Sequence, residues 1–185
     1  MTCRHFRTCN GLKLAANRHV LQIDMGIKDA FLNKGWAGRT MSRQETIEHI
    51  NPLIRIHHEL NHAYRHAINH VSNREVARRL DGFQRTARAD IGKLSETVLS
   101  AGGVAYNGID LERGGDRSAS EEGALVRNLK DAEEEFHRCL TDELAGNHQI
   151  RSRAILSVVQ ANSRVRLDYL HDVERTFGRS TNSSR

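Results

Sequence analysis

Residues 42–71 read SRQETIEHINPLIRIHHELNHAYRHAINHV, and this stretch decides the fold. Its apolar side chains recur at steps of three and four residues, which places them on one stripe of an amphipathic helix. The stripe consists of Ile47, Ile50, Leu53, Ile54, Leu60, Tyr64, Ala67, Ile68 and Val71. Three later segments repeat its length and pattern. We therefore expect it to be the first helix of a four-helix bundle.

The composition favours an all-α protein, because the chain has one proline and 28% charged residues, which suits long helices. Its formal charge of +5 comes from the first 40 residues, which hold seven Lys/Arg and two Asp/Glu. Residues 41–185 hold the remaining 21 (28 minus 7) basic and 21 (23 minus 2) acidic residues. The bundle itself is neutral by this count, which argues against nucleic acid as a partner of the folded part.

Residues 1–41 show no sustained period, and we expect a disordered leader. Met41 directly precedes the capping box Ser42-Arg43-Gln44-Glu45, so translation could begin at Met41 and leave the leader unmade. Cys3, His5 and Cys9 match no common zinc site, because a fourth ligand is missing. Three scattered cysteines suggest no disulfide framework, and with no secretory signal or membrane span in the sequence we expect a cytoplasmic protein.

Pro52 leaves two alternatives for the first helix. A proline ten residues into a helix lacks a backbone donor and crowds the carbonyl of Glu48, which predicts a kink. Alternatively, Asn51 caps a helix that restarts with Pro52 at its first position.

The second helix should begin at the capping box Ser72-Asn73-Arg74-Glu75 and end at Gly102-Gly103. Its apolar line is Val76, Leu80, Phe83, Ala87, Ile91, Leu94 and Val98. Residues 104–117 form the one long connection, which is long enough to run the length of a bundle.

The third helix should begin at the box Ser118-Ala119-Ser120-Glu121 and end at Gly146, with a stripe of Leu125, Leu129, Ala132, Phe136, Cys139, Leu140 and Leu144. Asn147 is a candidate cap for the fourth helix, which we expect to end at Gly178 before a disordered tail at 179–185. Its expected inward line is Ala154, Val158, Asn162, Val165, Tyr169 and Val173. Short, long and short connections are typical of ferritin-like bundles, in which the second and third helices are parallel. We expect this bundle to occupy residues 42–178.

Residues 46–103 resemble the first hairpin of a bacterial ferritin-like family of unknown function. The residues that carry the resemblance are Thr46-Ile47, Asn51, Leu53-Ile54, Tyr64-Arg65, Ala67, Val71, Glu75, Leu94, Val98 and Gly102-Gly103. Over residues 118–177 it rests on length, on Glu-Glu-Phe before Leu140 and on Val165-Arg166. The resemblance implies the bundle and carries no enzymatic activity with it.

Ferritin-like di-iron sites need inward carboxylates on all four helices, with Glu-x-x-His on two of them. This chain has the motif at Glu59/His62 and at Glu134/His137, on the first and third helices rather than the second and fourth. At about 100° per residue both pairs lie away from the apolar stripes. We expect them to face water and no di-iron centre to form.

Polar residues at expected core positions predict a polar layer at mid-height. His57 lies in the centre of the first stripe and Asn162 in that of the fourth, and parallel second and third helices bring Asp90 and Glu133 to the same level. We interpret the layer as hydrogen bonding that fixes helix register. The alternative is a single divalent metal ion held by His57, Asp90 and Glu133, which are too few for two metals.

These observations predict a non-enzymatic ferritin-like bundle without a cofactor, acting by self-association or by binding another protein. A stress-associated role follows only by analogy with ferritin-like proteins. The alternatives are a metal-binding protein and, through the basic leader, a nucleic-acid binder.

Overall fold

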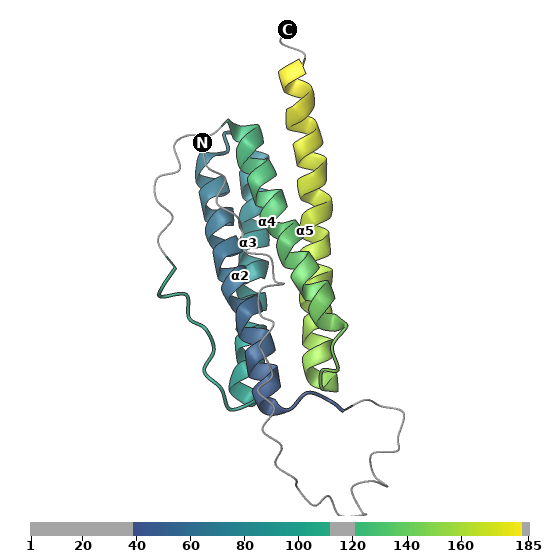
Figure 1. The fold of residues 1–185 in the computed structure, drawn as a ribbon. Coiled ribbons are helices and arrows are strands. Elements are labelled where there is room, and N and C mark those ends of the chain that lie inside the picture. Colours follow the sequence, from purple (N-terminus) through teal and green to yellow (C-terminus); the bar gives the residue numbers. More distant parts are fainter. Residues whose placement is uncertain (1–38, 112–120, 183–185) are drawn as a thin grey trace, which may run out of the picture. The chain divides into compact units, whose positions relative to one another are not determined.

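The computed structural model describes residues 39–111 and 121–182, and within them four helices form one bundle (Figure 1). The chain divides into two units, Met1–Arg39 and Thr40–Arg185, and the second contains all four helices. The expectations for the leader, including those for Cys3, His5 and Cys9, lie outside the described residues. None of the described helices is long and apolar enough to cross a membrane.

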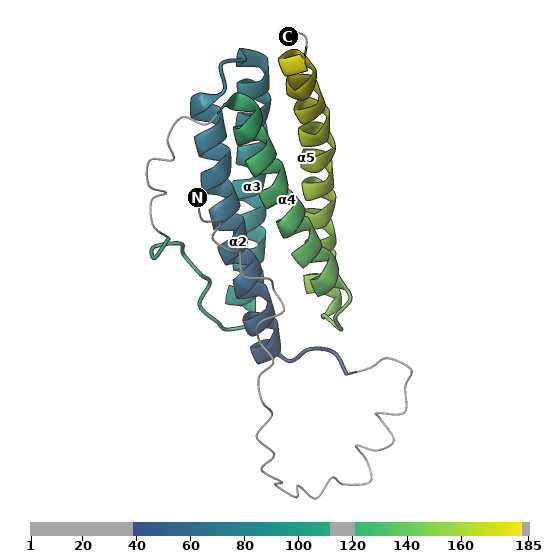
Figure 2. The same ribbon diagram turned by 45° about the horizontal axis from the view of Figure 1, so that its top comes forward.

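The four helices are α2 (Arg43–His70), α3 (Arg74–Ser100), α4 (Glu122–Leu144) and α5 (Ile150–Asn182). Helix α2 packs against α3 and α4, and α5 packs against α4 and α3, so the helices occupy the corners of a square. Two views of the bundle show that α3 and α4 run in the same direction and that α2 and α5 run opposite to them (Figure 1 and Figure 2). Every neighbouring pair is therefore antiparallel.

Helix α2 begins as its capping box predicts. The Ser42 hydroxyl accepts a hydrogen bond from the Glu45 backbone N–H, and the Glu45 carboxylate accepts one from the Ser42 N–H. The helix then continues without a break past Pro52 to His70, so the alternative of a restarted helix is wrong.

Asn51 fastens the crossover to α2 instead of capping a helix. Its side-chain amide donates to the Val104 carbonyl at 3.0 Å and accepts from the Tyr106 N–H at 2.9 Å. The Asn51 side chain thus supplies one hydrogen-bond donor and one acceptor to the backbone of the connection. It directs residues 104–106 along α2.

Helix α3 ends at the predicted glycine pair for two physical reasons. Gly102 has φ +87°, a left-handed conformation that side chains disfavour. At Gly103 a Cβ would lie 2.6 Å from the Ile47 side chain, so only glycine allows this approach to α2. The Gly102 N–H donates to the Leu99 carbonyl and the Gly103 N–H to the Val98 carbonyl, which is the Schellman pattern.

The other predicted helix ends need correction. Helix α3 is capped by Asn73 rather than Ser72, because the Asn73 side chain accepts from the N–H groups of Glu75 and Val76. Helix α4 begins after Glu121, three residues later than the predicted box requires, and Ser118–Ser120 lie outside the described residues.

Both ends of α5 also differ from the prediction. The helix begins at Ile150, not directly after Asn147, whose backbone carbonyl instead accepts from the Met41 N–H. It continues through Gly178 to Asn182, because a single glycine inside a helix costs only about 1 kcal/mol.

The core confirms the predicted stripes of α2, α3 and α4, whose central members are buried. The predicted inward line of α5 is wrong for most of its length. Val158 and Val165 are 47% and 54% exposed, and Ala154 is exposed as well. The line that enters the core is instead Ser152, Leu156, Val159, Ser163, Arg166, Leu170 and Val173.

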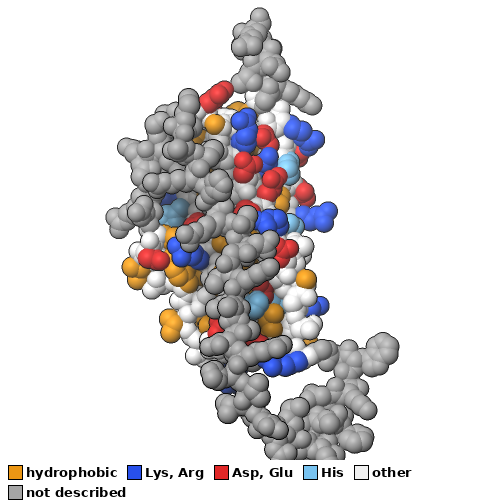
Figure 3. Space-filling view, viewed as in Figure 1, with side chains coloured by type: hydrophobic (Ala, Val, Ile, Leu, Met, Phe, Trp, Pro, Cys, Tyr) orange, Lys and Arg blue, Asp and Glu red, His pale blue; other side chains and the backbone are white. Residues whose placement is uncertain are grey.

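Charged side chains of both signs are interspersed over the face of α4 and α5 that Figure 3 presents. Ion pairs also connect α4 and α5. The Glu174 carboxylate lies 3.1 Å from the Lys130 ammonium and 3.3 Å from the Arg127 guanidinium.

Candidate functional site

Arg166 is the largest fully buried side chain of the bundle, and 1% of it is exposed. It lies on the inward line of α5, where its neighbours one turn away are Ser163 and Leu170. A charge in this position must be paired, because removing it from water without a partner costs several kcal/mol.

Glu133 of α4 is the first partner of Arg166. The Arg166 Nε lies 3.0 Å from both carboxylate oxygens, and the Tyr64 hydroxyl of α2 donates to Oε2 at 2.8 Å. The Ser163 hydroxyl donates to Oε1 at 2.7 Å. Arg166 Nη2 lies 3.0 Å from Oε1 but is not directed along a hydrogen bond, so it adds charge attraction only.

Asp90 of α3 is the second partner. Arg166 Nη1 donates to Oδ2 at 3.2 Å, and Oδ1 accepts from the Asn162 amide at 2.9 Å and from the Lys93 ammonium at 3.0 Å. Asp90 is fully buried, whereas 41% of the Lys93 side chain is exposed. Lys93 therefore connects the interior carboxylate to the surface.

We call Tyr64, Asp90, Glu133, Asn162, Ser163 and Arg166 the charged layer. All four helices contribute to it, and all four carboxylate oxygens receive a hydrogen bond from the protein. The predicted polar layer at mid-height is present, with ionic pairing at its centre. Asn162 itself is half-buried at the edge of the layer, and the prediction of a central position for it is wrong.

The layer fixes the protonation states of Arg166 and Tyr64. Burial acts against the charge of Arg166, but the Glu133 carboxylate, with Tyr64 and Asp90 adding to it, raises the pKa of the guanidinium above its usual value. Burial, and then the charge of Glu133, raises the pKa of the Tyr64 phenol well above 10.0. Tyr64 therefore acts as a hydrogen-bond donor across the physiological range.

His57 is buried but stays outside the layer. Its ring lies 4.2 Å from the ring of Phe136, centroid to centroid, and neither ring nitrogen has a hydrogen-bond partner among the described residues. Burial, with the positive charge of Arg166 adding to it, holds the pKa of His57 well below 6.5. The imidazole is therefore neutral at physiological pH.

The structure brings together two of the three predicted metal ligands. Asp90 and Glu133 meet, but on Arg166, and His57 packs against Phe136 instead of facing them. Among residues 39–111 and 121–182 no group of three His, Cys, Asp or Glu is arranged to hold a metal ion.

The glutamates of the two Glu-x-x-His pairs lie at the bundle surface, as predicted, whereas His62 and His137 are half-buried. Glu59 is 37% exposed and lies 3.4 Å from the Arg55 guanidinium, and Glu134 is 45% exposed and lies 3.4 Å from His171 of α5. Each glutamate is thus engaged by a neighbouring cation or imidazole rather than by its own motif histidine.

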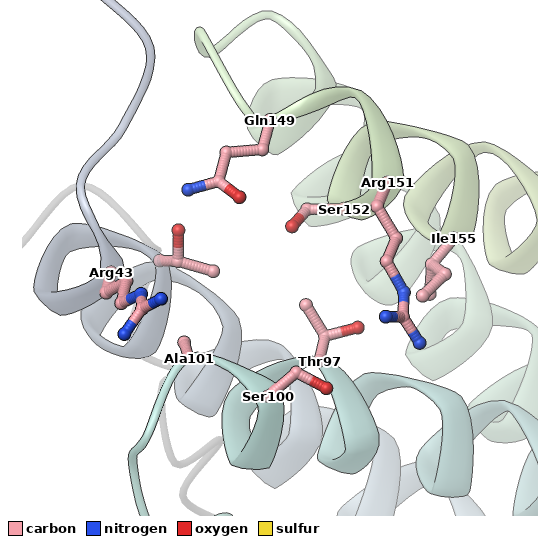
Figure 4. Close-up of a pocket in the computed structure, with 9 residues that line it drawn as sticks. Arg43, Thr97, Ser100, Ala101, Gln149, Arg151, Ser152 and Ile155 are labelled. Carbon is pink, nitrogen blue, oxygen red and sulfur yellow. The ribbon is translucent and has the colours of Figure 1, made fainter.

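A polar hollow of about 180 Å³ lies at the end of the bundle where α2 and α5 begin (Figure 4). Gln149 and Ser152 point into it from the start of α5, and Thr97 and Ser100 line it from the end of α3. Arg151 also lines it, but donates to Glu96 at 3.0 Å. The hollow contains no pair of acid and base for catalysis among its lining residues.

Arg166 and Ser163, which complete the layer, were not predicted from the sequence. Their signal was available: together with Val159, Leu170 and Val173 they continue a strict alternation of three- and four-residue steps. Because Ser163 and Arg166 are polar, a search for apolar periodicity does not detect this line.

No protein-family model, curated protein or solved structure matches this chain. The all-α four-helix bundle therefore rests on the structure itself, and the function has to be argued from the charged layer.

Proposed function

We propose that this chain is a non-enzymatic ferritin-like bundle that acts by self-association or by binding another protein, with an arginine in the place of a metal centre. The ferritin-like part is supported by the helix order, by the long crossover and by parallel α3 and α4. A stress-associated role rests on that analogy alone.

The observation that carries the proposal is that protein donors already bind all the oxygens of the interior carboxylates. Ferritin-like metal proteins present inward carboxylates to bridge two metal ions. Here the inward carboxylates are Asp90 and Glu133, and every oxygen of both accepts a hydrogen bond from a protein donor. The Arg166 guanidinium supplies the positive charge that metal ions would otherwise provide.

Metal binding is the second candidate, and one observation favours it. The two ring nitrogens of buried His57 lack a hydrogen-bond partner among the described residues, and a neutral imidazole is a good metal ligand. An ion using His57, Asp90 and Glu133 would have to displace Arg166, and the displaced guanidinium would then need another partner.

Elemental analysis decides between the two candidates. Protein purified after growth with added iron, manganese and zinc should contain far less than one ion per chain, and it should oxidise ferrous iron no faster than buffer. Stoichiometric metal that is lost in Glu133→Ala, but retained in the surface control Glu134→Ala, would contradict the proposal. The control is matched because Glu134 is the adjacent, exposed carboxylate of the same helix.

A further inference from the structure

Helix α5 carries a second apolar stripe on the side that faces away from the core. Ala154, Val158, Ala161 and Val165 recur at steps of four, three and four residues, and all four are exposed. The same alternation continues to Arg151 before them and to Asp168 and Asp172 after them. Residues spaced in this way form the contact seam of a coiled coil.

We propose that this outward stripe binds the α5 helix of a second copy of the chain in antiparallel orientation, about a two-fold axis that passes between Val158 and Ala161. The inference deepens the proposed self-association and rests on it. A two-fold interface must be complementary to itself, because each residue on one side of the axis meets a different residue of the second copy.

The sizes of the side chains along the stripe are self-complementary. In an antiparallel pair centred between Val158 and Ala161, Val158 lies opposite Ala161 of the second copy, and Ala154 lies opposite Val165. Each layer therefore combines one small and one larger apolar side chain. The helices can approach closely without leaving gaps.

The charges at the two ends of the stripe are self-complementary as well. The same pairing places Arg151 opposite Asp168 of the second copy, and the two-fold axis forms this contact twice. A parallel pair would instead place Arg151 against Arg151 and Asp168 against Asp168. Opposite charges at the seam thus select the antiparallel orientation.

Within one chain these two charges cannot pair with each other. Arg151 and Asp168 are 17 residues apart (168 minus 151), or about 25 Å along one helix, so they cannot pair in the same copy. The bond from Arg151 to Glu96 joins two side chains that are 71% and 64% exposed, and such pairs contribute little. Asp168 has no ion-pair partner among the residues that the structure describes.

Sedimentation velocity of the full chain at low salt tests the proposal with charge reversals. Arg151→Glu and Asp168→Arg each place like charges at two positions of the dimer, so each variant alone should self-associate at least roughly tenfold more weakly than the natural chain. An equimolar mixture of the two variants should recover the association, because both contacts of the mixed dimer again join opposite charges. The control Arg153→Glu makes the same charge change on the same helix but off the stripe, and should associate like the natural chain.

Three results would overturn the pairing: a natural chain that is monomeric at roughly 1 mM, association that the control weakens as much as Arg151→Glu does, or a mixture that fails to recover. These results are distinct from failure of the proposed function. A metal-loaded protein would refute the proposed function whatever its association state. A metal-free monomer would refute the antiparallel pairing and leave binding to another protein as the remaining part of the proposed function.

Discussion

Helices α2 and α5 both bury a polar residue at mid-height, but they accommodate it in opposite ways. His57 on α2 is neutral, packs against Phe136 and has no hydrogen-bond partner among the described residues. Arg166 on α5 stays charged between Glu133 and Asp90. A buried side chain that can lose its charge needs only space, whereas one that cannot lose it needs a complete set of partners.

The strongest test of this difference is Arg166→Leu. It leaves Glu133 and Asp90 buried without their common cation, which should lower the free energy of unfolding by about 3 to 5 kcal/mol. Urea unfolding measures the change. Arg164→Leu removes an exposed arginine of the same helix and should change stability by less than about 0.5 kcal/mol. A loss below about 1 kcal/mol in Arg166→Leu would show that the layer is not stabilised by this pairing.

The two apolar stripes of α5 give the next largest contrast. Val159→Ala opens space in the core, where Val159 is fully buried, and should cost about 2 kcal/mol. Val165→Ala alters a side chain that is 54% exposed and should cost less than about 0.5 kcal/mol. Thermal melts of dilute samples compare the two, and equal losses would mean that α5 is rotated relative to the structure.

His57→Leu should make the protein more stable, by about 1 kcal/mol at pH 7, because it removes two unpaired ring nitrogens from the core. It should also change the response to acid. The folded-state pKa of His57 is depressed, so the unfolded chain binds a proton as the pH falls through about 6.5 and the folded chain does not. The natural protein should therefore lose roughly 1 kcal/mol more than the variant between about pH 7 and pH 5.5.

Urea unfolding at both pH values measures that difference. His62→Leu is the control, because His62 is only half-buried on the same helix. If His57→Leu and the natural chain lost stability in parallel on acidification, His57 would be shown to titrate normally.

Asn162→Leu should have the smallest effect of the substitutions in the charged layer. It removes one of the two hydrogen bonds to Asp90 Oδ1, but Lys93 still donates to that oxygen. We expect a loss of about 1 kcal/mol or less, measured by urea unfolding. Asn162→Asp should cost more, since it places a second carboxylate beside Asp90, and a ranking in the opposite order would remove Asn162 from the layer.

The sequence predicted α2, α3 and α4 well because their stripes are apolar almost throughout. It also predicted that Asp90 and Glu133 would share a level, because the loop lengths imply parallel α3 and α4. It could not predict the partner of these carboxylates. An arginine is expected at the surface, and only its tertiary neighbours decide whether burial is compensated.

The error on α5 has a related cause. The helix carries two stripes at nearly opposite sides, and the outward one, with Ala154, Val158 and Val165, looks more apolar than the inward one, with Ser163 and Arg166. Periodicity locates stripes on a helix but does not show which of them faces the core.

The amide of Asn51 has a consequence for how the chain folds. Because it binds Val104 and Tyr106, the start of the crossover is tied to the α2–α3 hairpin and needs no contact from α4 or α5. Once α2 and α3 have paired, Val104 lies only four residues beyond the end of α3 at Ser100, so this contact adds little further chain entropy. We expect the first hairpin to set the route of the connection before the second hairpin docks. Asn51→Ala should then slow refolding more than it speeds unfolding.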